Sequence, residues 1–186
     1  MSRCKICRAE FVKRSIAHKV CGPECAEAFA AVERERKART SLREARIRAK
    51  SRSKWLAEAQ AAFNAYVRAR DSLAGYGCIS CGTRNGKMNA GHYRSVGACP
   101  ELRFEESQVH LQCERCNSTL SANLIPYRQE LLRRVGTEKL AWIEGPHQPK
   151  RYTISDAQQI KKTYKQKLRE LDNAEQKRIK GNCAEC

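Results

Sequence analysis

The feature that most constrains this chain is a central stretch in which two Cys-x-x-Cys pairs bracket two of its four histidines. The pairs are Cys78/Cys81 and Cys113/Cys116. Each pair suits a tight turn, and two such turns together offer the four thiolates that tetrahedral zinc requires. The sequence therefore predicts a structural zinc site that joins the two ends of this stretch.

A second cysteine set lies at the N-terminus and predicts another zinc site. Its members are Cys4, Cys7, Cys21 and Cys25. The dipeptide Gly22-Pro23 and the Ala- and Glu-rich run behind it predict that a helix begins here. A set of metal-free buried thiols or a redox pair is the alternative to zinc. This zinc knuckle could bind DNA, hold the fold together or form a protein-contact surface.

The charge of the chain favours a nucleic-acid partner. Its 186 residues include 37 Lys and Arg against 20 Asp and Glu, a formal net charge of +17. Clustered basic side chains release counterions from phosphates, so nucleic acid ranks above acidic membranes. No apolar run is long enough to span a bilayer, so we expect no membrane partner. The first residues lack a secretory signal, so we expect a reducing cytoplasm and metal-bound cysteines rather than disulfides.

A long basic helix is expected between the two cysteine sets. No proline or glycine interrupts residues 24–72, and the middle of this stretch is polar on every face. Such a helix either lies on a polyanion or is a solvated linker. The basic residues expected to contact DNA from this helix are Arg39, Arg43, Arg46 and Lys50. An apolar stripe over residues 55–67 is expected to dock on the central stretch.

Three helices are expected after the second Cys-x-x-Cys pair. Gly136 is placed to end the first, and Gly145-Pro146 the second. Ser155 with Gln158 forms an expected capping box for a helix that runs to about Ile179. Its thin apolar stripe suits a partner helix in this chain or in a second copy. The tail cysteines Cys183 and Cys186 form a half-site that Cys99, another subunit or nothing could complete.

Side chains suited to phosphodiester hydrolysis lie within the central stretch. His92 has an ordinary pKa near the working range, so its neutral imidazole could take the proton of an attacking water. The amide oxygen of Asn117 could ligate Mg²⁺. His110 lies in an expected strand, where it points away from its two apolar neighbours, into the site or into solvent. The nearby positive charges are Lys87, Arg94, Arg103 and Arg115. A zinc staple with an incidental histidine is the alternative interpretation.

The order of these residues resembles the HNH (ββα-metal) nuclease superfamily in its zinc-stapled form: Cys-x-x-Cys, Gly-His, then Cys-x-x-Cys followed at once by Asn. The finer pattern AGHYRS…LRFEESQVHLQCERCN…AN…Y, with a helix ending in Gly136, closely resembles the NinG, or Rap, recombination endonucleases of lambda-like phages over the whole chain. This resemblance implies cleavage of branched DNA, such as Holliday junctions and D-loops, in the host cytoplasm. It also implies a β-hairpin carrying His92 as general base and a helix carrying Asn117 as metal ligand.

Two positions depart from the family pattern. Gly91 stands where many HNH enzymes have an acidic metal ligand, and Gln108 stands where the middle Asn, which orients the base loop, is usual. Gln can supply the same amide, so the second departure is mild. The candidates for the remaining ligand of the catalytic metal are His110, Glu101, Glu105, Glu106 and Asn123.

These observations predict a mainly α protein with a small zinc-bound ββα-metal (HNH-like) core, an N-terminal four-cysteine zinc knuckle and long basic helices. The expected segments are the knuckle (1–29), the basic helix (30–72), the nuclease core (73–145) and a linker with the C-terminal helix and tail (146–186). The expected metals are two structural Zn²⁺ ions and a catalytic Mg²⁺ or Mn²⁺. Resolving a four-way junction needs two active sites, so we expect a homodimer. A non-enzymatic zinc-containing DNA-binding protein is the competing class.

Overall fold

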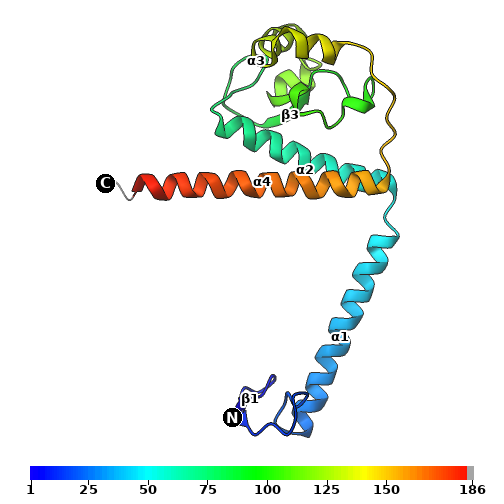
Figure 1. The fold of residues 1–186 in the computed structure, drawn as a ribbon, viewed down its shortest axis with the longest axis vertical. Coiled ribbons are helices and arrows are strands. Elements are labelled where there is room, and N and C mark those ends of the chain that lie inside the picture. The colour runs from blue at the N-terminus through cyan, green and yellow to red at the C-terminus, as the bar shows by residue number, and fades with distance from the viewer. Residues whose placement is uncertain (184–186) are drawn as a thin grey trace. The chain divides into compact units, whose positions relative to one another are not determined.

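The computed structural model describes residues 1–183 of the chain, and it divides them into two compact units (Figure 1). Unit 1 is Met1–Lys50, and unit 2 begins at Ser51. The described chain is mainly helical, as predicted, and contains two small two-stranded sheets. The central hairpin was expected, whereas the N-terminal sheet was not. The four segments expected from the sequence stay a prediction. Cys186 and the side chain of Cys183 lie outside the description.

Unit 1 consists of a small cysteine-bearing ribbon and one helix. The strands β1 (Ser2–Arg3) and β2 (Glu10–Phe11) pair antiparallel, and the helix α1 spans Pro23–Arg48. Only two apolar side chains of this unit are buried, those of Cys4 and Val20. So few buried groups cannot offset the conformational entropy of about fifty residues. Unit 1 therefore needs another source of stability, and its four cysteines are the available one.

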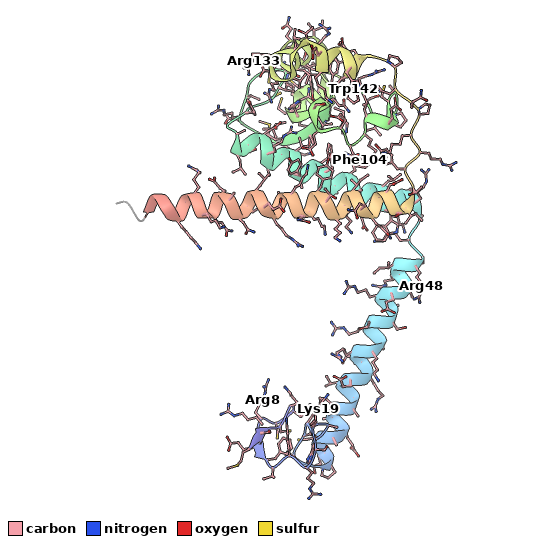
Figure 2. All side chains as sticks on the ribbon, viewed as in Figure 1. Arg8, Lys19, Arg48, Phe104, Arg133 and Trp142 are labelled. Atoms are coloured by element: carbon pink, nitrogen blue, oxygen red, sulfur yellow. The ribbon has the colours of Figure 1, made fainter. Side chains whose placement is uncertain are left out.

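The helix α1 has no buried face, although a few residues near its start, such as Cys25 and Phe29, are half-buried. None of its 26 residues is buried, and Figure 2 shows its side chains standing out along its length. The prediction of one uninterrupted helix over residues 30–72 was wrong. The helix ends at Arg48, and α2 (Arg52–Leu73) begins after Ser51, whose hydroxyl accepts a hydrogen bond from the Lys54 amide at 3.4 Å. Ser51 is the N-cap of α2, so the new helix starts at a capping side chain although no proline or glycine interrupts the chain.

Unit 2 is built around one β-hairpin. Its strands are β3 (Met88–His92) and β4 (Val109–Cys113), which pair antiparallel with His92 opposite Val109 and Gly91 opposite His110. The strand expected around His110 is thereby confirmed. Cross-strand partners point to the same face, and successive residues alternate. His92 and His110 therefore lie on opposite faces of the hairpin.

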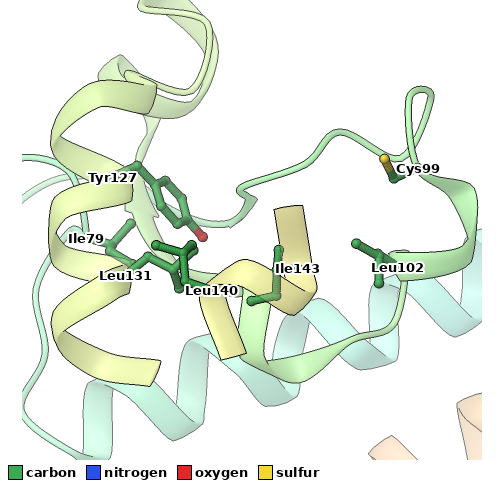
Figure 3. Close-up of a cluster of buried hydrophobic side chains, with 7 residues drawn as sticks. All are labelled: Ile79, Cys99, Leu102, Tyr127, Leu131, Leu140 and Ile143. Atoms are coloured by element: carbon green, nitrogen blue, oxygen red, sulfur yellow. The ribbon is translucent and has the colours of Figure 1, made fainter. Parts of the chain in front are cut away.

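The two faces of the hairpin pack against different helices. Ala90 and Val109 join Phe63 and Val67 of α2 in one buried cluster, so the stripe predicted over residues 55–67 docks on the central stretch as expected. The other face meets α3 (Leu124–Glu144) through Tyr127, whose hydroxyl donates to the carbonyls of Gly91 at 2.9 Å and Gln108 at 3.1 Å. Figure 3 shows the second buried cluster, which includes Tyr127. Its members are Ile79, Cys99, Leu102, Tyr127, Leu131, Leu140 and Ile143.

Glycines shape α3 as the sequence predicts. Gly136 adopts φ 79°, ψ 169° and divides α3 into two helical pieces, while Gly145 follows the last residue of the second. A positive φ of this size is open to glycine at little steric cost, which explains why the first piece ends there. Cys99 lies in the buried cluster of Figure 3 at 2% exposure, so its thiol is enclosed by apolar side chains.

The C-terminal helix α4 (Ile154–Cys183) begins earlier than predicted. The expected capping box of Ser155 and Gln158 is wrong. Thr153 instead accepts a hydrogen bond from the Asp156 amide at 3.1 Å, and the Asp156 carboxylate accepts from the Thr153 amide at 2.8 Å. This Thr-x-x-Asp pair is a capping box that lies two residues before the expected one, and it provides acceptors for backbone N–H groups at the start of the helix.

The apolar stripe of α4 finds its partner helix within this chain. Ile160 and Tyr164 pack with the α2 stripe, and Figure 1 shows the two helices side by side. Tyr152, in the expected linker, is buried against Trp55 and Ala157. No helix among the described residues is both long enough and apolar enough to cross a membrane.

Candidate metal centres and active site

The central cysteine cluster is formed by two turns at the ends of the hairpin. Cys78 and Cys81 lie on a turn closed by hydrogen bonds from Gly82 N to Cys78 O at 2.7 Å and from Cys78 N to Thr83 O at 2.7 Å. Gly77 allows this turn to close, since a Cβ there would lie 2.3 Å from the Gly82 carbonyl oxygen. Cys113 ends β4, and Cys116 lies in the π-helical turn η3 (Arg115–Thr119).

The N-terminal cluster combines a turn with a helix start. Cys4 and Cys7 lie between β1 and β2, where Arg8 N donates to Cys4 O at 3.1 Å and Arg8 adopts φ 65°. Cys25 lies in the first turn of α1, which Gly22 and Pro23 open as predicted. The sequence therefore predicted the local geometry of this site as well as its residues.

Both clusters fit zinc. In each, the four Sγ atoms lie within 4.8 Å of one another. Sulfur pairs are 3.4 Å apart for Cys7 and Cys21 and 3.8 Å apart for Cys81 and Cys113. A tetrahedral Zn²⁺ with Zn–S bonds of about 2.3 Å separates its sulfurs by about 3.8 Å, whereas a disulfide requires about 2.05 Å. These residues can hold one Zn²⁺ per cluster, which would join the hairpin ends in unit 2 and the ribbon to α1 in unit 1.

His92 ends β3 and is held by a backbone carbonyl. Its Nε2 lies 3.1 Å from Arg103 O. A carbonyl only accepts hydrogen bonds, so Nε2 carries the proton and Nδ1 keeps a free lone pair in the neutral ring. The ring is partly buried near Phe63, with ring centroids 6.4 Å apart. Burial lowers the pKa of His92 below its ordinary 6.5 and outweighs the Arg103 hydrogen bond, which raises it, so the imidazole is neutral at pH 7.

Gln108 braces the loop that positions His92. It is fully buried, its Oε1 accepts from Arg94 N at 2.8 Å, and its Nε2 donates to Leu102 O at 2.8 Å. One amide side chain thus ties both ends of the loop between the strands. Its backbone carbonyl also accepts from Tyr93 N at 3.0 Å. The role that the family resemblance implies for Gln108, orienting the base loop, stays a prediction.

Gly91 has no room for an acidic side chain. A Cβ at this position would lie 2.1 Å from Gln112 Oε1. Gln112 is fully buried, and its Nε2 donates to Ser80 Oγ at 2.8 Å and to Ala122 O at 2.6 Å. The amide of Gln112 therefore occupies the space in which the family's acidic ligand would start. No pattern of neighbouring residues indicates this exchange, because Gln112 lies on the opposite strand.

Asn117 lies on a short turn rather than on the expected helix. The π-helical turn η3 covers only five residues, and Ser121, Ala122 and Asn123 follow with φ of 47°, 71° and 43°. Three successive non-glycine residues with positive φ are strained and occur where surrounding contacts impose them. The Asn117 side chain is partly exposed, and within the described residues its one hydrogen bond runs from Nδ2 to Ser118 Oγ at 3.5 Å. Its Oδ1 is free to accept a cation.

The donor set for a catalytic Mg²⁺ is sparse. Within the described residues, only the two cysteine clusters gather three or more Cys, His, Asp or Glu ligand atoms. Glu105 accepts from Ser107 and pairs with Lys139, while Glu106 accepts from two tyrosines and from Lys167. Mg²⁺ is usually bound through one or two carboxylates and keeps several waters, whereas Asn117 offers a neutral amide oxygen. Asn123 donates its amide to Cys116 Sγ at 3.4 Å.

His110 belongs to a buried ionic network that the sequence did not reveal. It is 7% exposed, its Nε2 donates to Ser107 O at 3.2 Å, and its Nδ1 lies 3.5 Å from Asp71 Oδ2. The alternative that His110 points into solvent was therefore wrong. Asp71 also accepts from Arg70 Nε at 2.7 Å and from Leu111 N at 2.7 Å, and so covers the free edge of β4. Asp71 lies near the end of α2, and no sequence motif marks it.

We expect Asp71→Ala to destabilise unit 2 by about 3–5 kcal/mol, because it leaves buried partners without their counter-charge. Burial raises the pKa of Asp71, but its contacts with His110 and with the Arg70 guanidinium lower it to about 2 from an ordinary 3.8. Its stabilisation, about 2 kcal/mol, is therefore present above about pH 4 and lost as pH falls toward 2. Urea unfolding across that range tests this. Asp172→Ala, at an exposed site on α4, is the control; an equal effect of both variants would contradict the network's role.

The basic residues proposed for DNA contact differ in whether they already form hydrogen bonds or ion pairs within the protein. Arg94 donates to Ile143 O at 3.0 Å and Gly145 O at 2.9 Å, which caps the end of α3. Arg103 donates to Gln60 Oε1 at 2.7 Å, and Lys87 pairs with Glu114. Arg115 is exposed. In unit 1, Arg39, Arg43, Arg46 and Lys50 line a shallow groove on α1 with Leu42 and Ile47.

Comparison with known proteins supports the family resemblance that the order of the motifs indicates. The family model described as "Bacteriophage Lambda NinG protein" matches residues 1–175. The chain is similar to Protein ninG of Escherichia phage 933W, with 46% identity over 67% of this chain and 62% of that relative, less than two thirds of its length. It is 40% identical to Protein ninG of Escherichia phage lambda over 83% of this chain and 84% of the relative, and 38% identical to that of Salmonella phage P22 over 81% and 83%. No solved structure matches the chain. On the family match and these identities, the chain belongs to the NinG family of lambdoid bacteriophages.

Proposed function

We propose that this protein is a divalent-metal-dependent DNA endonuclease that cuts branched DNA, with His92 as its general base. The observation that carries the proposal is the setting of His92. It lies at the end of a hairpin strand, its Nε2 is held by the Arg103 carbonyl, and its Nδ1 lone pair is uncommitted within the described residues. A general base needs a fixed orientation and a proton-free nitrogen, and His92 has both.

The electrostatic setting supports neutral His92 as the base. Because burial lowers the pKa of His92, the ring does not need to lose a proton before it accepts one from water at pH 7. Gln108 fixes the loop that carries Arg103, and so fixes the position of the ring relative to the strand.

Asn117 is the proposed protein ligand of the catalytic cation. Its exposed Oδ1 lies on the turn directly after Cys116, which a zinc ion would hold to the hairpin. A bound Mg²⁺ or Mn²⁺ would supply charge to stabilise the scissile phosphate and its leaving oxygen. The protein's own part is to hold Asn117 in place and to keep one amide oxygen free of other partners.

Branched DNA and a homodimer are proposed from the family resemblance described above. The net charge of +17 supports DNA as the partner, because phosphate neutralisation dominates nucleic-acid affinity. It does not distinguish a junction from a linear duplex. Two copies of the chain would supply the two active sites that paired cuts in a four-way junction need.

A second candidate function is a non-enzymatic zinc-containing DNA-binding protein. One observation favours it: within the described residues, no third cluster of Cys, His, Asp or Glu accompanies the two cysteine clusters. Under this alternative His92 would be a structural residue, and DNA would be bound but not cut in the presence of Mg²⁺.

The test is incubation of the purified protein with an end-labelled four-way junction and a linear duplex of matched sequence. Each reaction contains Mg²⁺, Mn²⁺ or no added divalent cation, so that the zinc is left in place. We expect cuts near the crossover that require the added cation and are weak on the duplex. Tight binding without cleavage under any of the three conditions would favour the non-enzymatic alternative and contradict the nuclease.

A further inference from the structure

A basic pocket in unit 2 lies apart from the residues proposed for catalysis. It encloses about 600 Å³ between the glycine-rich turn that leads into Cys78 and one side of α3. Its charged lining residues are Arg84, Arg133, Arg134 and Glu130. Three guanidinium groups against one carboxylate leave two positive charges uncompensated among the lining residues. Such an excess of positive charge attracts an anion.

Arg134 is the buried cation of this pocket. Its side chain is only 8% exposed, and its Nη1 is enclosed without a hydrogen-bond partner within the described residues. Nη1 lies 3.9 Å from Asp71 Oδ2, too far for a hydrogen bond, and the guanidinium stacks at 4.0 Å on the Tyr76 ring, another lining residue. Because Nη1 is enclosed beside Asp71, Arg134 contributes its positive charge to the pocket rather than this donor.

Glu130 holds two of the arginines in a fixed arrangement. Its carboxylate accepts from Arg133 Nε at 2.7 Å and Nη2 at 2.6 Å, and from Arg134 Nε at 2.9 Å. The hydrogen bond from Arg133 is the main reason that the pKa of Glu130 falls to about 2, so the carboxylate stays charged. Each guanidinium has five N–H donors, and Arg133 therefore keeps three for a ligand. Positioning before binding reduces the entropy lost when the ligand arrives.

The third arginine comes from the other wall of the pocket. Arg84 Nη2 donates to the carbonyl of Gly75 at 2.5 Å, so its side chain is drawn toward the glycine-rich turn. Arg133 projects from α3 and is exposed (Figure 2). Guanidinium groups on both walls suit an anion with several oxygens, since planar forks bind phosphate oxygens in pairs.

We propose that this pocket binds a phosphodiester group of the DNA backbone, at a position separate from the one that is cut. The proposal rests on DNA being the partner of this protein, as proposed above. A phosphate held here would anchor the zinc-bound turn and α3 on the strand. It would contribute to affinity at every sequence, because phosphate contacts position a protein without reading bases.

The test compares Arg133→Gln with Arg178→Gln in the full chain. Arg178 on α4 forms the same bidentate pair three residues from its glutamate, with 65% exposure against 67% for Arg133, but does not line the pocket. Anisotropy of labelled duplex and junction is measured from low to high salt, and thermal midpoints check folding. We expect Arg133→Gln to make the negative slope of log affinity against log salt concentration shallower by about 0.9. At 0.1 M salt this change corresponds to about eightfold weaker binding. Arg178→Gln should match the wild type.

Each other outcome overturns the proposal in a distinguishable way. Equal slopes for the two variants, with wild-type protein still binding and cutting DNA, reject the pocket and leave the nuclease standing. Wild-type protein that neither binds nor cuts rejects both. A third arm adds inorganic phosphate at ionic strength matched with chloride. A rise in thermal midpoint that Arg133→Gln abolishes, with no change in DNA slope, would assign the pocket to free phosphate and reject the DNA backbone.

Discussion

Replacing His92 by alanine is expected to lower junction cleavage by about 10²–10⁴-fold, the usual contribution of a general base. The side chain that accepts the proton of water is removed, whereas both cysteine clusters and the basic residues are untouched. Zinc content, measured by metal analysis, and junction affinity in the absence of divalent cation should equal those of the wild type. His147→Ala is the control, because His147 is also partly buried and its Nε2 lies 3.3 Å from the carbonyl of Ile143.

The pH profile adds a second readout of the same residue. The wild-type rate should fall as the pH drops through the pKa of His92, because the protonated ring cannot accept a proton. That inflection should lie below 6.5, since burial lowers this pKa. If His92→Ala cleaves at the wild-type rate, His92 is not the general base. If the variant loses its zinc together with its activity, the loss of cleavage is not evidence for that role.

Replacing Cys81 by serine should reduce bound zinc from two ions to one per chain and unfold the hairpin region. Cys81 is exposed, so the substitution removes a ligand with little change in packing. Structural zinc contributes an apparent 10–16 kcal/mol, roughly, to folding, and whole domains are stable by only about 5–15 kcal/mol. We therefore expect unit 2 to lose its hairpin when this ion is lost. Metal analysis and hydrogen exchange over residues 78–116 measure the two effects.

Cys99→Ser is the matched control for this experiment. Cys99 is 2% exposed and lies outside both clusters, so the same substitution there tests burial without ligation. We expect two zinc ions per chain and a modest stability loss of about 1–3 kcal/mol from burying a hydroxyl. Two zinc ions in Cys81→Ser, or equal exchange protection in both variants, would mean that the central cluster does not hold the hairpin.

The parts of the fold that the sequence predicted depend on local chemistry. The turns of both cysteine clusters, the start of α1 at Pro23 and the break at Gly136 each follow from a few adjacent residues with strong conformational preferences. The errors at Ser51 and Thr153 also arose locally, because several serines and threonines compete as helix caps and tertiary packing decides among them.

The parts that the sequence missed depend on residues brought together from distant positions. Asp71 gains its role only when α2 lies along the edge of β4, where it meets Leu111 N and His110. Gln112 occupies the space beside Gly91 only because of the hairpin register. Neither contact corresponds to a sequence spacing from which it could be predicted. The same reason explains why the short turn carrying Asn117 was expected as a helix, since the strained residues after it are imposed by neighbours.

Because α1 has no buried residue, its charge can change without a change in its packing, whereas in most helices the two are coupled. Because none of its 26 residues is buried, replacing an arginine there changes the electric field around unit 1 without disturbing any packed core. Selection can therefore tune the charge of this segment residue by residue, free of the folding constraint that limits substitutions in α2. Among relatives, α1 should tolerate large drift in sequence while its excess of positive charge persists.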